Sequence, residues 1–211
     1  MPVTVCAFLT AFSGIVYEFA LAQSLSVLLG NSMLQYALTI GLFLAAMGAG
    51  AFAVSRDEPR GERRLLRLQV LLAVLAPAGF IALWAAAFEL PRAGVWVAAG
   101  TLVSGVGYLT GAELPLLMNF RHHARLRVLA ADYFGMLAAA IAFPLFLLPR
   151  LGIFGSFLLA SALNACVAQV FAGGLPRHLR IFLWILPVAL ILMLIKEESI
   201  RQWLSHHVTS A

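Results

Sequence analysis

Long apolar runs, separated by short polar connections, dominate the chain. Seven of these runs are long enough, or nearly long enough, to cross a bilayer, which needs about 20 helical residues. They cover Thr4–Leu29, Ser32–Val54, Leu66–Phe88, Ala93–Met118, Val128–Leu148, Ile153–Phe171 and Ile181–Ile195. The pattern predicts an all-α protein, a polytopic transmembrane bundle of about seven helices.

The polar stretches are too short to fold separately. We therefore expect residues 1–195 to form one transmembrane helical domain and residues 196–211 to form a short amphipathic or disordered C-terminal tail. In that tail, charged residues beginning at Lys196 precede apolar residues such as Trp203, which is typical of a helix lying in the membrane interface. The first run is too long for a signal peptide, so we expect it to remain in the mature protein.

Composition agrees with a membrane protein. Hydrophobic residues make up 63% of the 211 residues and charged residues 11%, whereas a soluble domain is about half apolar and about a quarter charged. The net charge of +5 comes from arginines in short connections between apolar runs, so we expect the lipid bilayer as a partner and no nucleic acid.

The basic residues are unevenly divided between alternate connections. Ten arginines occupy the second, fourth and sixth connections: Arg56, Arg60, Arg63, Arg64, Arg67, Arg121, Arg125, Arg127, Arg177 and Arg180. The other connections contain no basic residue, Arg92 alone or Arg150 alone. The positive-inside rule then predicts that the Arg-rich loops and the N-terminus are cytoplasmic. Seven full spans would place the C-terminus outside, whereas a seventh run that only dips into the membrane would leave the tail cytoplasmic.

Three carboxylates, Glu18, Glu113 and Asp132, fall inside apolar runs. An acidic residue at the centre of a bilayer costs roughly 2.5–3.5 kcal/mol on insertion scales, so each needs a compensating role. Glu18 lies near the middle of the first run, with Tyr17 and Gln23 nearby. Glu113 and Asp132 flank one short connection at similar depth, so packing of their helices would let them share a site.

Carboxylates in such a site would hold a cation between them, or one of them would be protonated. We therefore predict a ligand site formed by Glu18, Glu113 and Asp132 with Tyr17 and Gln23. Structural alternatives remain open for two of the acids.

One alternative is that Asp132 only pairs with Arg125 or Arg127 at the membrane interface. Another is that Glu113 bonds backbone groups that are left without partners near Pro115.

Small residues four positions apart mark two faces that permit close helix packing. One face contains Gly107 and Gly111 in the fourth run, and the other contains Ala131, Gly135 and Ala139 in the fifth. We predict a close contact between the fourth and fifth helices through these faces.

The chain contains none of the short motifs of soluble catalysis. It has no Cys/His spacing typical of a metal site, no glycine-rich nucleotide loop and no nucleophile elbow. We therefore expect no metal, no cofactor and no catalytic residue in this chain.

Four segments resemble, in order, the membrane part of bacterial spermidine-synthase-like proteins. They are YEFALAQSLSVLLGNSMLQYALTIGLFLAAMGAG (Tyr17–Gly50), GAELPLLM (Gly111–Met118), ADYFGMLAAAIAFPLFLLPRLG (Ala131–Gly152) and SALNACVA (Ser161–Ala168). The resemblance implies a bacterial inner-membrane location and matches the family's acidic positions to Glu18, Glu113 and Asp132. In the family a soluble aminopropyltransferase domain follows the helices, and this chain ends at Ala211 without one. We therefore expect no aminopropyl transfer by this chain alone.

Three functional hypotheses follow from the acids and the resemblance. The leading one is that the helices bind, and move, a small organic cation such as a polyamine. The second is a non-catalytic membrane anchor or scaffold that docks a separate synthase-like enzyme through the Arg-rich loops. The third is a membrane enzyme with an unrecognised site.

Overall fold

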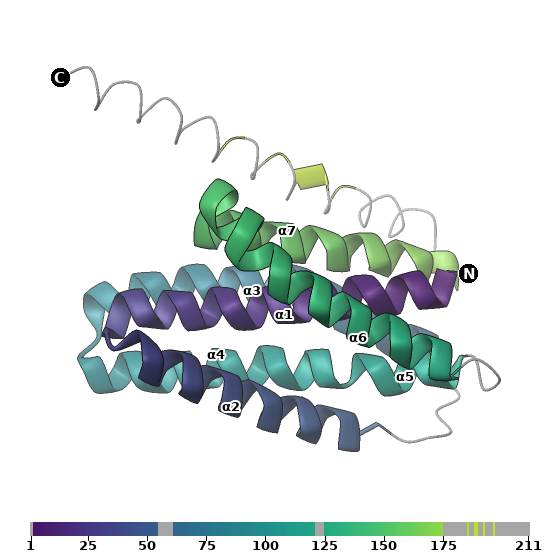
Figure 1. Ribbon diagram of the computed structural model, residues 1–211, viewed down its shortest axis with the longest axis horizontal. Helices are drawn as coiled ribbons and strands as arrows, with labels where there is room; N and C mark the ends of the chain where they lie inside the picture. The colour runs from purple at the N-terminus through teal and green to yellow at the C-terminus, as the bar shows by residue number, and fades with distance from the viewer. Residues whose placement is uncertain are drawn as a thin grey trace.

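A computed structural model describes residues 2–54, 61–120 and 125–174, together with residues 185, 188, 189, 192 and 196. Within these residues the chain is helical, without strands (Figure 1). The bundle consists of α1 (Pro2–Leu29), α2 (Ser32–Phe52), α3 (Gly61–Glu89), α4 (Arg92–Gly111), α5 (Glu113–Asn119), α6 (Arg125–Ala142) and α7 (Leu148–Val170). A π-helical turn, η2 (Phe143–Leu147), joins α6 to α7, and η3 (Ala172–Gly174) follows α7.

Five helical stretches in the described part of the chain are long and apolar enough to cross a membrane. They are Val3–Leu29, Ser32–Phe52, Gly61–Glu89, Arg92–Asn119 and Arg125–Val170. The first four match the first four predicted runs. The predicted run Ile181–Ile195 and the tail 196–211 lie outside the described residues, apart from the single positions named above.

The fifth stretch is 46 residues long and contains a reversal. Gly152 adopts φ 69° and ψ −171°, which is not helical and which residues with a Cβ rarely adopt. The chain turns back there, so α6 and α7 run in opposite senses (Figure 1). The break lies between the predicted runs Val128–Leu148 and Ile153–Phe171, as the sequence pattern indicated.

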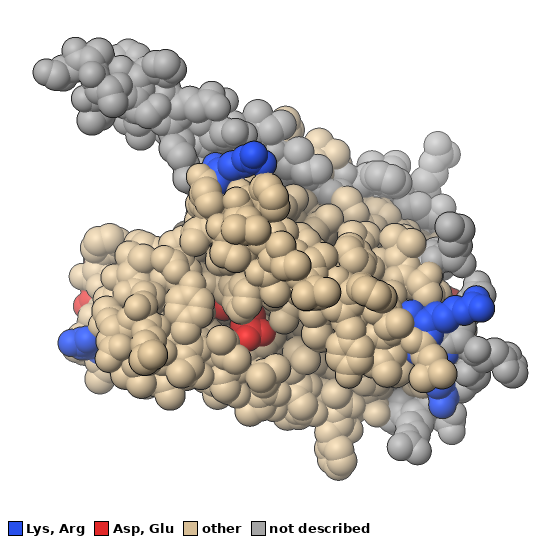
Figure 2. Space-filling view, in the orientation of Figure 1, with Lys and Arg blue, Asp and Glu red and all other residues tan. Residues whose placement is uncertain are grey.

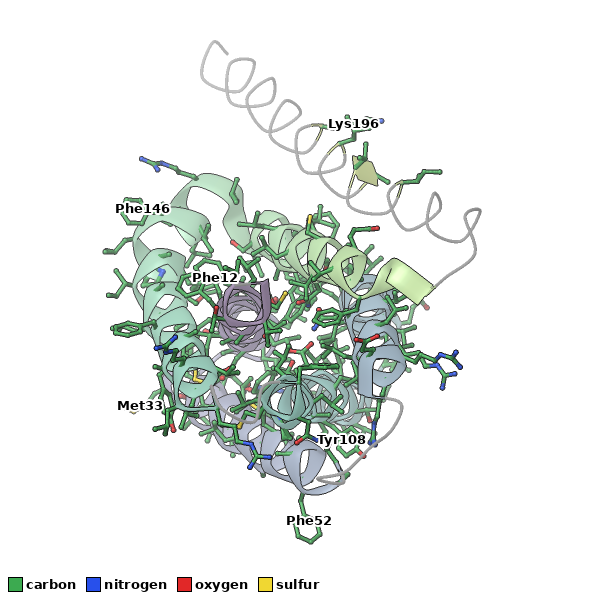
Figure 3. All side chains as sticks on the ribbon, turned by 90° about the vertical axis from the view of Figure 1, so that its right-hand side faces the viewer. Phe12, Met33, Phe52, Tyr108, Phe146 and Lys196 are labelled. Atoms are coloured by element: carbon green, nitrogen blue, oxygen red, sulfur yellow. The ribbon has the colours of Figure 1, made fainter. Side chains whose placement is uncertain are left out.

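Helix α1 is the interior helix of the bundle. It contacts α2, α4, α6 and α7, and 67% of its most apolar window is buried, against 33% or less for the other stretches. The view along the bundle shows helices on several sides of α1, while labelled outer side chains such as Phe52 and Phe146 project away from it (Figure 3). Four polar residues of α1 are accordingly buried: Thr10, Ser13, Glu18 and Ser24.

The outer surface of the bundle is apolar. Met33 is 85% exposed and Phe52 is 93% exposed, and the space-filling view is almost free of charge between its ends (Figure 2). Exposed apolar area of this extent is rare on soluble monomers and is compatible with a membrane protein.

The glycine faces pack closely, but against other partners than predicted. A Cβ at Gly111 would collide with the backbone of Met47, and one at Gly107 would lie 2.8 Å from the Phe43 carbonyl, so this face of α4 packs against α2. A Cβ at Gly135 would collide with the carbonyl of Phe8, so α6 packs against α1. The predicted contact between the fourth and fifth helices through these glycines is therefore wrong, because each small face has a different neighbour.

The fourth predicted run is interrupted at Ala112, between α4 and α5. Pro115 has no backbone N–H and cannot donate to the carbonyl four residues earlier, that of Gly111. The helix therefore ends and restarts at this point, and Glu113 becomes the first residue of α5.

Five of the described arginines gather at one end of the bundle, which we call the Arg-rich end. A Cβ at Gly61, where α3 begins, would lie 3.7 Å from Phe120, which follows α5. Phe120 also stacks on Phe171 after α7, with 5.6 Å between ring centroids. This end holds Arg63, Arg64, Arg67, Arg125 and Arg127.

The other arginines lie away from this end. The guanidinium of Arg92 donates a 2.6 Å hydrogen bond to the Leu29 carbonyl, at the junction of α1 and α4. Arg150 lies at the start of α7. Basic side chains accordingly cluster at the right of Figure 2, with isolated ones at the left and top.

Candidate functional site: a cavity with two carboxylates

A cavity of about 320 Å³ lies between α1, α2, α6 and the α4–α5 junction. Glu113 and Asp132 both line it, so the structure brings these two predicted site residues together. Most of the remaining wall is apolar and includes Ile15, Phe43, Met47, Leu114, Met118 and Met136. The cavity therefore combines two acidic groups with a hydrocarbon-like lining.

Local helix geometry aims both carboxylates inward. Glu113 begins α5 at the interruption beside Pro115, and it is 2% exposed. Asp132 lies seven residues after Arg125, where α6 begins, and it is 4% exposed. Its neighbour Gly135 holds α6 against α1, so close helix packing fixes the position of Asp132.

The two carboxylates have different hydrogen-bond partners. The Gln69 Nε2 amide donates a 2.7 Å hydrogen bond to Glu113 Oε1, whereas Asp132 Oδ2 is buried without a hydrogen-bond partner in the described part of the chain. Both carboxylates line the same cavity. Within the described part of the chain, the residues that line the cavity include no Lys, Arg or His, so these lining residues offer the carboxylates no positive partner.

Glu18 lies deeper in the bundle than this pair. It follows Thr10 and Gly14, which line the cavity, by eight and four positions on α1. At 1.5 Å per residue, Glu18 is about 12 Å farther along the helix axis than Thr10. Glu18 is 3% exposed, and its Oε2 has no hydrogen-bond partner among described residues. The structure therefore places Glu18 on the side of α1 that faces the cavity but outside the cavity lining.

Acidic side chains are visible near the middle of the apolar face in Figure 2. That face is formed by α2 and α6 with α1 behind them (Figure 1). The three candidate carboxylates are themselves only 2–4% exposed.

Tyr17 belongs to a hydrogen-bond network rather than to the cavity lining. Its hydroxyl lies 3.1 Å from Ser161 Oγ and 3.2 Å from the Leu72 carbonyl, and it accepts a 3.2 Å bond from Asn164 Nδ2. The Ser13 hydroxyl donates a 2.7 Å bond to Asn164 Oδ1. The network ties α1 to α3 and α7, and it defines their packing.

Gln23 has a similar structural contact. The Tyr36 hydroxyl donates a 2.6 Å hydrogen bond to Gln23 Oε1, joining α1 and α2. Neither Tyr17 nor Gln23 lines the cavity of Glu113 and Asp132, and a ligand role for either residue stays a prediction.

Three further buried polar residues, to which sequence analysis gave no ligand role, lie on α2 and α3. Gln69, the partner of Glu113, is a lone amide in the third apolar run. Gln35 and Thr39 lie two turns and one turn before Phe43 on α2, and each has a buried oxygen without a hydrogen-bond partner among the described residues. Gln35, Thr39 and Phe43 are four positions apart, which places them on one face of the helix. This spacing was the sequence pattern that could have linked Gln35 and Thr39 to the cavity wall.

Known proteins resemble the chain over most of its length. It is 35% identical over 172 residues to polyamine aminopropyltransferase 1 of Streptomyces coelicolor, which covers 77% of this chain and 32% of that protein. It is 35% identical over 170 residues to polyamine aminopropyltransferase 2 of Ralstonia nicotianae, covering 76% of this chain and 33% of that protein. For the polyamine aminopropyltransferase of Mycobacterium tuberculosis, identity is 32% over 182 residues, 80% of this chain and 34% of that protein.

No family model matches the chain, and no solved structure matches it. The chain spans about a third of the length of the curated relatives that it matches. The resemblance to spermidine-synthase-like proteins is confirmed: this all-helical chain is a relative of the polyamine aminopropyltransferases and corresponds to about one third of their length.

Proposed function

We propose that this chain is a multi-pass protein of the bacterial inner membrane that binds a small organic cation, such as a polyamine, in the cavity of Glu113 and Asp132. The observation that carries the proposal is the buried carboxylate pair, which faces a cavity without a cationic side chain among the described residues that line it. Ionisable groups within membrane helices commonly mark ligand or ion pathways. The relatives' name, polyamine aminopropyltransferase, supports a polyamine as the cation.

The lining suits an aliphatic amine. Ammonium groups would replace water with the Asp132 and Glu113 carboxylates, forming charge-assisted hydrogen bonds. The methylene segments would contact Met47, Met118 and Met136, whose unbranched thioether side chains adapt to irregular shapes. A hydrated metal ion would form few favourable contacts with so apolar a wall.

Glu18 extends the proposal along α1. Glu18 lies three positions, or about 4.5 Å of helix, beyond the lining residue Ile15, and it offers a further carboxylate for a linear amine with separated charges. Movement of the cation from the Glu113–Asp132 cavity toward Glu18 would be the first step of transport. On α2, Gln35 and Thr39 supply further buried oxygens that have no hydrogen-bond partner among the described residues.

The membrane orientation is part of the proposal. We place the Arg-rich end in the cytoplasm, because five of the described arginines gather there. Single cysteines at Arg63 and Arg125, in a background without Cys166, should resist an impermeant thiol reagent in intact cells and react after lysis. A cysteine at Arg92 should react in intact cells. Labelling of Arg63→Cys and Arg125→Cys from outside would reverse the orientation.

The second candidate is a non-catalytic scaffold that docks a separate synthase-like enzyme. The observation that favours it is the same Arg-rich end, a basic surface suited to an acidic partner. This candidate requires no ligand in the cavity, so a cavity that does not bind amines would leave it as the better account.

Photolabelling tests the proposal and distinguishes the two candidates. A spermidine analogue carrying a diazirine should attach to peptides that contain the cavity wall, those around Met118 and Met136, and excess spermidine should prevent the labelling. Labelling confined to the Arg-rich end, or labelling that spermidine does not prevent, would reject the cavity as the amine site.

A further inference from the structure

The cavity has a side opening between two helices that both pack on α1. One edge is formed by Leu44 and Gly48 of α2, and the other by Met136 of α6. Leu44 is 51% exposed and Gly48 is also exposed, so the α2 edge faces outward rather than into the bundle. Met136 is also partly exposed, whereas Glu113 and Asp132 are buried behind this edge.

Gly48 differs from the neighbouring glycines in what surrounds it. A Cβ at Gly50 would collide with the carbonyl of Tyr108, so Gly50 is required for packing of α2 on α4. A Cβ at Gly48 would have no atom within 4 Å, although Gly48 lines the cavity. No helix contact among the described residues therefore requires a glycine at position 48. Without a side chain there, the edge of the cavity stays open.

The opening lies near the Arg-rich end. Gly48 precedes Phe52, the last residue of α2, by four positions, or about 6 Å of helix. In a bilayer this depth is close to the headgroups rather than to the midplane. An amine at the membrane surface would reach the carboxylates without crossing the hydrocarbon core.

We infer that amines reach the Glu113–Asp132 cavity from the side, between α2 and α6, and that Gly48 is the specificity-determining residue that keeps this route open. The inference rests on the proposed function for its ligand, but the route can be tested without that ligand. The edge formed by Leu44, Gly48 and Met136 is apolar, which favours amines with aliphatic chains. A lipid amine would also bring a phosphate toward two carboxylates, so the charges favour a free amine.

The test uses a cysteine in place of Met136, which lines the cavity on its α6 side, in a Cys166→Ser background. Cys166 is exposed, whereas the other cysteine, Cys6, is buried. The probe is aminoethyl methanethiosulfonate, a small aliphatic amine that forms a disulfide with a thiol and releases methanesulfinate. Purified protein in vesicles made of phosphatidylglycerol alone is compared with vesicles that also contain phosphatidylethanolamine.

Narrowing the opening should slow the reaction. Gly48→Leu should lower the modification rate of Met136→Cys at least tenfold. Gly41→Leu is the matched control, because Gly41 is on the same helix, also has open space around its Cβ position and does not line the cavity. Leu44→Trp is a second variant that narrows the same edge, and melting temperatures verify that each variant is folded.

The possible results test the entry route and the identity of the ligand independently. Equal rates in Gly48→Leu, Leu44→Trp and Gly41→Leu overturn the side route, even if spermidine binds. Slowing by the two edge variants alone supports the route, even if spermidine fails to protect the thiol, a failure that would count against the proposed function instead. Protection by phosphatidylethanolamine but not by spermidine would identify a lipid amine as the occupant and overturn the inference of a free amine.

Discussion

Leucine in place of Gly111 should destabilise the bundle by about 3 kcal/mol or more, at the upper end of the range for overpacked sites. The Cβ of any residue at position 111 would collide with the Met47 backbone, and a backbone cannot move aside as a flexible side chain can. The α4–α2 contact would have to separate. Thermal unfolding of the purified protein in detergent measures the effect.

Gly105→Leu is the control for this substitution. Gly105 lies on the same helix, and a Cβ there meets nothing within 4 Å. Its melting temperature should stay near that of the wild type. If Gly111→Leu and Gly105→Leu melt at the same temperature, α4 does not pack on α2 as described.

Replacing both cavity carboxylates by their amides should remove amine binding. Glu113→Gln with Asp132→Asn keeps the size of each side chain, and an amide oxygen at position 113 still accepts from Gln69. The ammonium groups would lose both opposite charges, and we expect the dissociation constant for spermidine to rise at least tenfold, which is about 1.4 kcal/mol. A ligand that binds only the folded state raises the melting temperature, so spermidine should stabilise the wild type and not the double variant.

Two single variants define the site further. Glu89→Gln removes an exposed acid at the end of α3, away from the cavity, and should bind spermidine like the wild type. Glu18→Gln should weaken binding less than the double variant, because Glu18 lies outside the cavity lining. If spermidine stabilises the double variant and the wild type equally, these carboxylates do not bind the amine.

Local patterns predicted much of the fold. Ser32 begins α2 as expected, where the Asn31 side chain accepts a hydrogen bond from the Leu34 backbone N–H. The reversal at Gly152 lies between two predicted runs, because the sequence around Pro149 and Gly152 cannot continue a regular helix. Such features depend on residues close together in the chain, which a sequence displays directly.

The choice of helix neighbours could not be read from the sequence. Gly111 and Gly135 both indicate close contacts, yet one meets α2 and the other α1. A lipid-exposed helix is apolar on its outer side as well as its inner side, so hydrophobicity does not distinguish the face that meets a neighbour. The backbone segments that these glycines contact, at Met47 of α2 and Phe8 of α1, are far away in the chain.

The candidate site could be predicted only in part, because some of its contacts join helices that are far apart in the sequence. Glu113 and Asp132 flank one connection, and their meeting in a cavity follows from short-range geometry. Gln69 reaches Glu113 from α3, 44 positions earlier, and only the assembled bundle shows that contact. Tyr17 adjoins Glu18 in sequence but points to Asn164 and Ser161 on α7, because neighbouring residues of a helix face different directions.

Calorimetric titration of the purified wild-type protein with spermidine tests the central claim most directly. The account predicts saturable binding with about one amine per cavity, and much weaker binding of diacetylspermidine, in which the two primary amines are neutral amides. The Glu113→Gln, Asp132→Asn variant should give no saturable heat under the same conditions. Absence of saturable heat from the folded wild type, or equal affinity for spermidine and its diacetylated form, would contradict the account.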